Sequence, residues 1–234
     1  MKLMIRIVGI LTLVFSMPMT GQTFKVCYEE WRPYAYTENN TSVGTIINKM
    51  QQVSLKHDLT FEFLELPHSR CLKSVDDGVN DLVLFVDQND GYEMFPSAIS
   101  YWHITLAIRE SDEYLKLFDP KIAARRIMVS REYHYDNSVY LALESLKARV
   151  VKGSYYAISE NEIRNLFRFL SGGQVDAIMI DRTWANLMIQ RYDLPVKLVP
   201  EFLISEPQFV GYKSLTKRSY VKLKAFMADY EASQ

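Results

Sequence analysis

Residues 78–86 are Gly-Val-Asn-Asp-Leu-Val-Leu-Phe-Val, and residues 173–181 are Gly-Gln-Val-Asp-Ala-Ile-Met-Ile-Asp. Both stretches begin with a glycine, which can end a helix. An aspartate follows three residues later, just before or at the start of an apolar run. A continuous apolar run is typical of a strand buried on both faces of a parallel sheet. The repetition predicts two lobes of one architecture rather than one continuous sheet.

The segments before Gly78 alternate between strand and helix patterns. Residues 24–28 and 60–64 are expected as strands, and residues 43–56 carry apolar side chains at helical spacing. A short helix around Leu72 then ends at Gly78. The order strand-helix-strand-helix-strand predicts an α/β lobe.

The second half repeats this order. Behind a capping-box pair, Ser159 and Glu162, apolar residues follow one helical stripe. The expected elements are a strand at 127–129, a helix at 138–147, a helix at 163–170 and a strand at 175–180.

Two further strands are expected to join the halves, at residues 102–109 and 209–213, and a last amphipathic helix covers 223–230. Two crossings would return the C-terminal helix to the first lobe. We therefore predict an α/β protein in which residues 23–104 plus 209–234 form lobe 1 and residues 105–208 form lobe 2. A ligand cleft between lobes joined by two strands is a hinge geometry.

The composition excludes several classes of protein. Of 234 residues, 48% are hydrophobic and 24% are charged, which is typical of globular chains and excludes a disordered chain or a long coiled coil. The formal net charge is -1, so no basic field is present to attract nucleic acid.

The N-terminus has the pattern of an export signal. Lys2 and Arg6 precede a short apolar run at residues 7–15. A membrane-spanning helix would need roughly 20 apolar residues. We expect residues 1–21 to be a cleaved signal peptide and the mature chain to be periplasmic. An uncleaved anchor or a buried helix is the alternative.

Cys27 and Cys71 fall near the carboxyl ends of neighbouring predicted strands. An oxidising compartment favours a disulfide between them. The histidines have no ligand spacing with one another or with the cysteines, so neither a metal nor another cofactor is expected. The four histidines are His57, His68, His103 and His134.

Four segments together resemble the bacterial extracellular solute-binding proteins of family 3, the two-lobed amino-acid-type receptors, and their small non-lipidated members most of all. Residues 27–34 resemble the family's first strand with its Trp-x-Pro-Tyr loop, and residues 66–72 resemble its Leu-Pro-Trp-x-Arg segment, with His68 replacing the tryptophan. Residues 78–81 and 161–181 resemble its Gly-x-x-Asp and its helix, strand and cleft acid. The resemblance spans nearly the whole mature chain. It implies the type II periplasmic-binding-protein fold.

Two positions depart from the family. Members that bind amino acids carry an arginine after the third strand, which pairs with the ligand α-carboxylate. Here that stretch, residues 87–93, is Asp-Gln-Asn-Asp-Gly-Tyr-Glu, and Asn48 stands where the family has an acid. The resemblance therefore leaves open whether the ligand is an α-amino acid.

Asp181 is the first candidate site residue, because it ends a buried strand at the sheet edge where open α/β sheets bind ligands. Its carboxylate could accept an ammonium or a hydroxyl group, and the family's acid at this position binds the ligand amine. The alternative is an N-cap for a helix at 182–190. Trp31 and Tyr34 follow the first strand, where they would stack on a ligand or pack at the lobe edge.

Arg70 lies at a predicted helix start, where a cation is unfavourable and needs an anionic partner. That partner could be a ligand group or an acid such as Glu29, in a structural ion pair. Arg131 and Tyr133 follow the first strand of lobe 2, either at an anion-binding helix start or in a solvated loop. Tyr92 lies where the family has its arginine and could line the cleft.

These residues favour a binding protein over an enzyme. We expect a monomer that captures a small polar ligand and presents it to an ABC-transporter permease or a membrane sensor. One alternative is a dehydratase-like enzyme on the same fold, although no Gly-x-Ser-x-Gly, His-Glu-x-x-His or phosphate-loop motif is present. The other is an interaction module without a small-molecule ligand, whose site its own side chains would fill.

Overall fold

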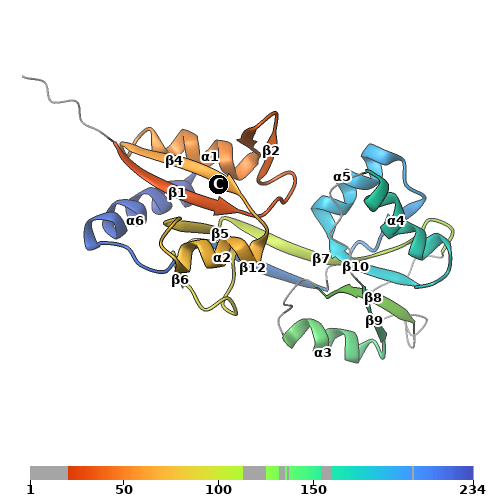
Figure 1. Cartoon of the computed structure of the whole chain (residues 1–234). Coiled ribbons are helices and arrows are strands. Elements are labelled where there is room, and N and C mark those ends of the chain that lie inside the picture. The colour runs from red at the N-terminus through yellow and green to blue at the C-terminus, as the bar shows by residue number, and fades with distance from the viewer. Residues whose placement is uncertain are drawn as a thin grey trace, which may run out of the picture.

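The chain is described by a computed structural model over residues 21–112, 125–131, 135, 137–153, 160–201 and 203–233. Figure 1 shows two α/β bodies joined by two long strands, β7 (Ser100–Arg109) and β12 (Ile204–Tyr212). We call the body on the left lobe 1 and the body on the right lobe 2. The predicted signal peptide lies outside the described residues except for Gly21.

Lobe 1 holds the N-terminal elements and the last helix (Figure 1). Its elements are β1 (Gln22–Tyr28), β2 (Tyr36–Glu38), β3 (Thr41–Val43), α1 (Thr45–Ser54), β4 (Leu59–Glu65), α2 (His68–Asp76), β5 (Leu82–Val86), β6 (Glu93–Met94) and α6 (Lys217–Ala232).

Two apolar layers cover the two faces of the lobe 1 sheet. On one face Val26 and Leu84 pack with Ile47 of α1 and Phe226 of α6. On the other face the disulfide between Cys27 and Cys71 ties β1 to α2, with 5.6 Å between the Cα atoms. The predicted disulfide is therefore confirmed, and Phe226 shows that the C-terminal helix packs in the core of lobe 1.

Lobe 2 repeats this arrangement with its own two apolar layers. Ile104 and Val139 belong to one layer, and Ile178 and Leu166 belong to the other. Its elements are β8 (Arg126–Ser130), α3 (Asn137–Ser145), β9 (Arg149–Gly153), α4 (Glu160–Ser171), β10 (Ala177–Asp181), α5 (Arg182–Tyr192) and β11 (Val196–Leu198).

The repeated Gly-x-x-Asp pattern has the same structural role in both lobes. Each glycine follows a helix and has a positive φ, 69° in lobe 1 and 65° in lobe 2. Asp81 accepts a hydrogen bond from the backbone of Lys25 at 2.8 Å, and Asp176 accepts one from the backbone of Arg126 at 2.9 Å. Each aspartate thus ties the strand that follows it to the first strand of its own lobe.

The two sheets are hydrogen-bonded to each other, in the order β4-β1-β5-β12-β7-β10-β8-β9. β12 pairs with β7 through residues 204–208 and with β5 from Phe209 onward. The prediction that the halves do not share a continuous sheet is wrong at this point. The connecting strands run side by side and satisfy each other's backbone groups, which closes the gap between the lobes.

Most predicted elements are confirmed within a few residues of the predicted bounds. The short strands β2, β3, β6 and β11 were not expected from the pattern, because a run of two or three residues shows no periodicity. β9 was not expected either, because its five residues are exposed or half-buried and lack the apolar run of a core strand. The capping-box serine, Ser159, lies outside the described residues. The lobe boundaries at 104/105 and 208/209 stay predictions. Within the described part of the chain, no helix is both long and apolar enough to cross a membrane.

Candidate functional site

The loop after β1 is fixed by its own backbone and by the start of α1. The N–H of Trp31 donates to the carbonyl of Ala35 at 2.7 Å, and the N–H of Tyr34 donates to the carbonyl of Trp31 at 2.8 Å. The first N–H groups of a helix have no partner within the helix. Here Thr45 and Ile46 donate theirs to the carbonyls of this loop, each at 3.0 Å. The loop is therefore a rigid platform.

Gly44 makes this docking possible. Its φ is 127°, in the region that favours glycine, and a Cβ atom placed on it would collide with the carbonyl of Tyr34. The aromatic rings of the loop pack against one another and against β5. The ring of Trp31 lies edge-on to Tyr34 and to Phe85, with centroids 4.7 Å and 4.9 Å apart. These half-buried rings form one wall of the interlobe region.

Asp181 faces this wall from lobe 2. It is the last residue of β10, and its Oδ1 accepts a hydrogen bond from the backbone of Trp184 at 2.6 Å, which caps α5. The predicted N-cap is therefore confirmed. The other oxygen, Oδ2, is buried, and no atom of the described residues makes a well-aligned hydrogen bond with it. One oxygen thus caps α5, and the other makes no well-aligned hydrogen bond with the described residues.

Burial raises the pKa of Asp181 to about 6, because only 8% of the residue is exposed. The backbone N–H of Trp184, the indole of Trp31 and the backbone N–H groups of Thr183 and His103 oppose this shift and offset it in part. At neutral pH the carboxylate is therefore ionised at the expense of stability. A cationic group beside Oδ2 would remove that cost.

The lobe 1 wall touches lobe 2 directly. The hydroxyl of Tyr34 donates to Oγ1 of Thr183 at 3.1 Å, across a sequence separation of 149 residues. The indole of Trp31 interacts with the carboxylate of Asp181. The structure therefore brings three of the predicted site residues together. We call Trp31, Tyr34, Asp181 and Thr183 the interlobe site. Sequence analysis missed Thr183, which has no signal beyond its position two residues after Asp181.

A second polar group lies at the carboxyl edge of the lobe 1 sheet. Glu29 follows β1, and its carboxylate accepts a hydrogen bond from the backbone of His68, the first residue of α2. Nε2 of His68 lies 3.4 Å from Oδ1 of Asp90. Asp87, at the end of β5, adds a third carboxylate. Three carboxylates therefore surround His68 at this edge of the sheet.

The electrostatics of this group follow from burial and mutual attraction. Burial raises the pKa of Glu29, and burial likewise raises the pKa of Asp87. Burial acts to lower the pKa of His68, but Asp90 and the other carboxylates outweigh it, so the net pKa is raised. His68 is thereby favoured as a cation, which offsets part of the negative charge.

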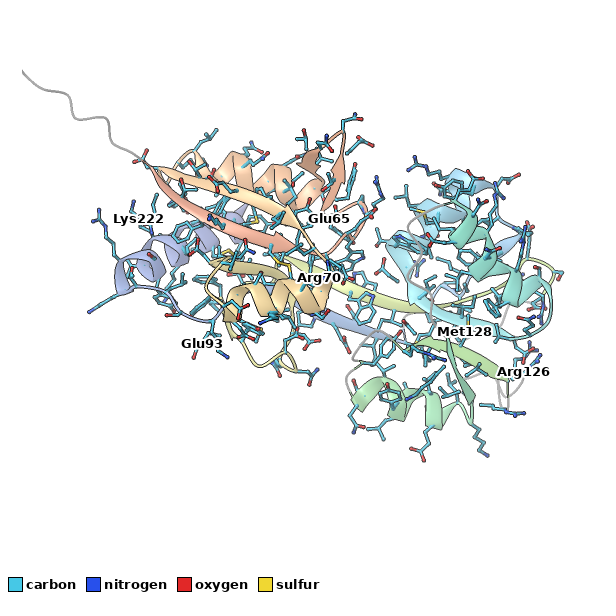
Figure 2. The ribbon with its side chains drawn as sticks, viewed as in Figure 1. Glu65, Arg70, Glu93, Arg126, Met128 and Lys222 are labelled. Atoms are coloured by element: carbon cyan, nitrogen blue, oxygen red, sulfur yellow. A yellow bond between two sulfur atoms is a disulfide. The ribbon has the colours of Figure 1, made fainter. Side chains whose placement is uncertain are left out.

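Arg70 forms no ion pair within 4.0 Å among the described residues, and Glu29 accepts a hydrogen bond from the backbone of His68 instead. The structural ion pair considered from the sequence is therefore not formed. Figure 2 labels Arg70 at the end of α2 that lies nearer to lobe 2, and its side chain is exposed. A cation on the N-terminal turn of a helix without a partner stays available to an anionic group.

Tyr92 and Arg131 make their polar contacts within their own lobes. The hydroxyl of Tyr92 donates to the carbonyl of Leu72 at 2.9 Å, and burial together with Asp76 raises its pKa to about 12. The guanidinium of Arg131 donates to the carbonyl of Lys152 at 3.1 Å. Both are therefore left out of the interlobe site. Tyr133 lies outside the described residues.

The neighbour of Tyr133, Tyr135, was not predicted as important. It is buried, its hydroxyl accepts a hydrogen bond from the backbone of Ser130 at 3.2 Å, and its ring stacks on Trp102 with centroids 5.4 Å apart. Tyr135 therefore fixes the end of β8 against a connecting strand.

No protein-family model and no curated protein sequence matches the chain. Solved structures do. The ligand-binding core of GluR0 in complex with L-glutamate is 16% identical, with a TM-score of 0.67, over 91% of this chain and 93% of that one. An ancestral arginine-binding protein bound to arginine is also 16% identical, with a TM-score of 0.64, over 91% of this chain and 94% of that one.

A histidine kinase sensor domain similar to periplasmic binding proteins gives a TM-score of 0.66 at 14% identity, over 91% of this chain and 94% of that one. A putative L-cystine ABC transporter from Listeria monocytogenes gives a TM-score of 0.64 at 15% identity, over 91% of this chain and 89% of that one. The chain has the two-lobed fold of periplasmic binding proteins. This likeness confirms the predicted α/β architecture with two connecting strands, and at these identities it concerns the fold alone.

Proposed function

We propose that this protein is a periplasmic solute-binding protein that holds a small polar ligand between its lobes through a cationic group of the ligand. The observation that carries the proposal is the buried carboxylate of Asp181. Its Oδ2 lacks a well-aligned partner among the described residues, and it faces the aromatic wall of Trp31 and Tyr34. An ammonium group fits such a place, because a carboxylate pairs with it and aromatic faces attract it.

Binding would act through the hinge. A ligand that contacts both lobes stabilises the closed arrangement by its higher affinity for that form. The closed form would then be recognised by a membrane transporter or a sensor, and the structural neighbours include binding proteins of both kinds. The amino-acid titles of several neighbours support amines and amino acids as the first ligands to test.

A thermal-shift screen of refolded, ligand-free protein tests the proposal. The panel contains amino acids, polyamines, organic acids and small sugars. A ligand at a hundred times its Kd adds roughly 2.7 kcal/mol, which raises Tm by roughly 5–11 °C for a chain of this size. The expected hits carry an ammonium group and are lost in Asp181→Asn, whereas Asp176→Asn keeps them because Asp176 pairs with Arg126 instead.

The pH dependence adds a second criterion. An ammonium ligand needs Asp181 ionised, so its affinity is expected to weaken roughly tenfold per pH unit below the pKa of about 6. Hits that are only organic acids, or hits that bind equally well in Asp181→Asn, would contradict the proposal.

One observation favours a second candidate, the interaction module. Tyr34 already contacts Thr183 with its own hydroxyl. If the lobes are permanently closed against each other without a ligand, no compound of the panel is expected to raise the Tm of the wild type or of Tyr34→Phe. A shift that appears only in Tyr34→Phe would mean that this contact competes with a ligand.

A further inference from the structure

Two buried side chains on the connecting strands, Ser100 and Gln208, each have a polar atom without a hydrogen-bond partner among the described residues. Ser100 opens β7 and Gln208 lies in β12, and they are only 9% and 6% exposed. Oγ of Ser100 and Nε2 of Gln208 are fully buried, and neither has a hydrogen-bond partner among the residues that the structure describes. A buried polar group without a partner lowers stability, so a fold that keeps two of them side by side needs another reason.

The strand register places these two groups together. Ser100 and Gln208 are directly opposite each other in the antiparallel pair of β7 and β12. Directly opposite residues in such a pair carry side chains on the same face, 4.5–5.5 Å apart at Cβ on typical geometry, so roughly one small group can bond to both. The hydroxyl and the amide together offer two donors to a single acceptor atom.

The same register places this polar pair on the face that carries Asp181. Ser100 and Ile104 lie four residues apart in β7, so their side chains share one face. Ile104 is the partner of Asp181 in β10. Ser100, Gln208 and Asp181 therefore point to the same side of the linked sheets, the side where the Trp31 indole meets Asp181.

The spacing along the strand sets the length of a ligand that could contact both places. Four residues of strand correspond to roughly 13 Å. A hydrogen bond of roughly 2.9 Å at each end leaves roughly 7 Å between the polar atoms of the ligand. That is an elongated molecule with polar groups at its two ends.

The burial of the two donors selects the type of end group. Burying a carboxylate without a cation beside it costs far more free energy than burying an uncharged carbonyl. Oγ of Ser100 and Nε2 of Gln208 are both fully buried. An uncharged carbonyl, as in a carboxamide or ureido group, therefore fits these two donors better than a carboxylate does.

We propose that Ser100 and Gln208 form a hydrogen-bonding subsite on the connecting strands. It recognises the uncharged carbonyl end of an elongated ligand whose ammonium end lies at Asp181. The inference rests on the proposed function, and it adds the chemistry of the second end of the ligand.

The experiment compares the full chain with Ser100→Ala and Gln208→Met, using L-citrulline and L-norleucine as probes. Both probes carry the α-ammonium group, and only L-citrulline ends in a ureido carbonyl. The wild type is expected to bind L-citrulline at least tenfold more tightly, and in Gln208→Met this ratio is expected to fall toward one. Without a probe, each variant is expected to melt about 2–4 °C higher, because an unpartnered buried group is removed.

Ser97→Ala is the matched control. Ser97 is equally buried, but its hydroxyl donates to Glu231 at 2.6 Å, so its loss is expected to lower Tm and to leave the probe ratio unchanged. If both connecting-strand variants melt lower, as the control does, an ordered water or another protein group satisfies the pair and the proposal is overturned.

An unchanged probe ratio in Gln208→Met, or a wild type that binds neither probe, also overturns it. The proposed function is judged separately, by the wider ligand panel and Asp181→Asn. A hit elsewhere in that panel therefore leaves the proposed function standing while this subsite fails.

Discussion

Replacing Asp181 by asparagine should make the ligand-free protein more stable at neutral pH. The pKa of this aspartate is raised from 3.8 to about 6, so the folded chain binds the proton more tightly than the unfolded chain does. Ionising Asp181 therefore costs stability. The cost is absent well below pH 4, grows as the pH rises from about 4 to 6, and is fully present above pH 6. Two pKa units correspond to about 3 kcal/mol.

Asparagine has the same shape, is uncharged at every pH and is an equally good N-cap for the backbone of Trp184. At pH 7.5 we expect the free energy of unfolding of Asp181→Asn to be about 3 kcal/mol higher than that of the wild type. This difference corresponds to a Tm higher by roughly 6–12 °C. At pH 4 the two chains should differ by much less. Urea denaturation followed by circular dichroism at a series of pH values measures the difference.

Asp176→Asn is the control with the opposite sign. Hydrogen bonds from Arg126 hold the pKa of Asp176 below its ordinary value, so its carboxylate stabilises the fold at neutral pH and this effect is lost as the pH falls through the folded pKa. Asp176→Asn should therefore be less stable than wild type at pH 7.5. An Asp181→Asn chain that is also less stable at pH 7.5, or whose advantage is the same at pH 4, would refute the reasoning.

Three other substitutions test the parts that build the site. Cys27→Ala with Cys71→Ala removes the disulfide, which joins residues 44 positions apart. The loss of about 4 kcal/mol expected from chain entropy predicts a Tm lower by roughly 8–16 °C in calorimetry, and a change under 2 °C would contradict it. Gly44→Ala should displace the aromatic loop and change tryptophan fluorescence, whereas Gly78→Ala, with open space around its Cβ position, should not; equal spectra would argue against the collision. Tyr34→Phe removes the hydrogen bond between the lobes, and small-angle X-ray scattering should show a larger radius of gyration, while an unchanged radius would mean that other contacts hold the lobes.

The secondary structure was predictable because local burial leaves a periodic pattern. The apolar run at 82–86 became a strand buried at every position, and the stripe behind Glu162 became α4. The disulfide was predictable because Cys27 lies near the carboxyl end of β1 and Cys71 follows the neighbouring strand β4, in α2. Asp181 was predictable because the end of a buried strand marks the ligand edge of an α/β sheet.

The partners of these residues were not predictable in the same way. Tyr92 and Arg131 carry suitable groups, yet their hydroxyl and guanidinium bond to carbonyls within their own lobes. Ser100 and Gln208 are single polar residues in apolar strands, and alternation alone says nothing of what lies opposite them. Glu29 was a possible partner for Arg70, and the turn that starts α2 gave it to His68 instead.

The sequence by itself determined the two α/β halves, the order of their elements, the disulfide and the acid at the end of β10. These follow from interactions within a helix, a strand or a pair of neighbouring strands, whose periodicity is written in the chain. Only the tertiary structure decided that the two sheets join through β12, that Tyr34 meets Thr183 and that Ser100 faces Gln208. Those contacts join residues more than a hundred positions apart, and they depend on the register of the two connecting strands, which no local pattern records.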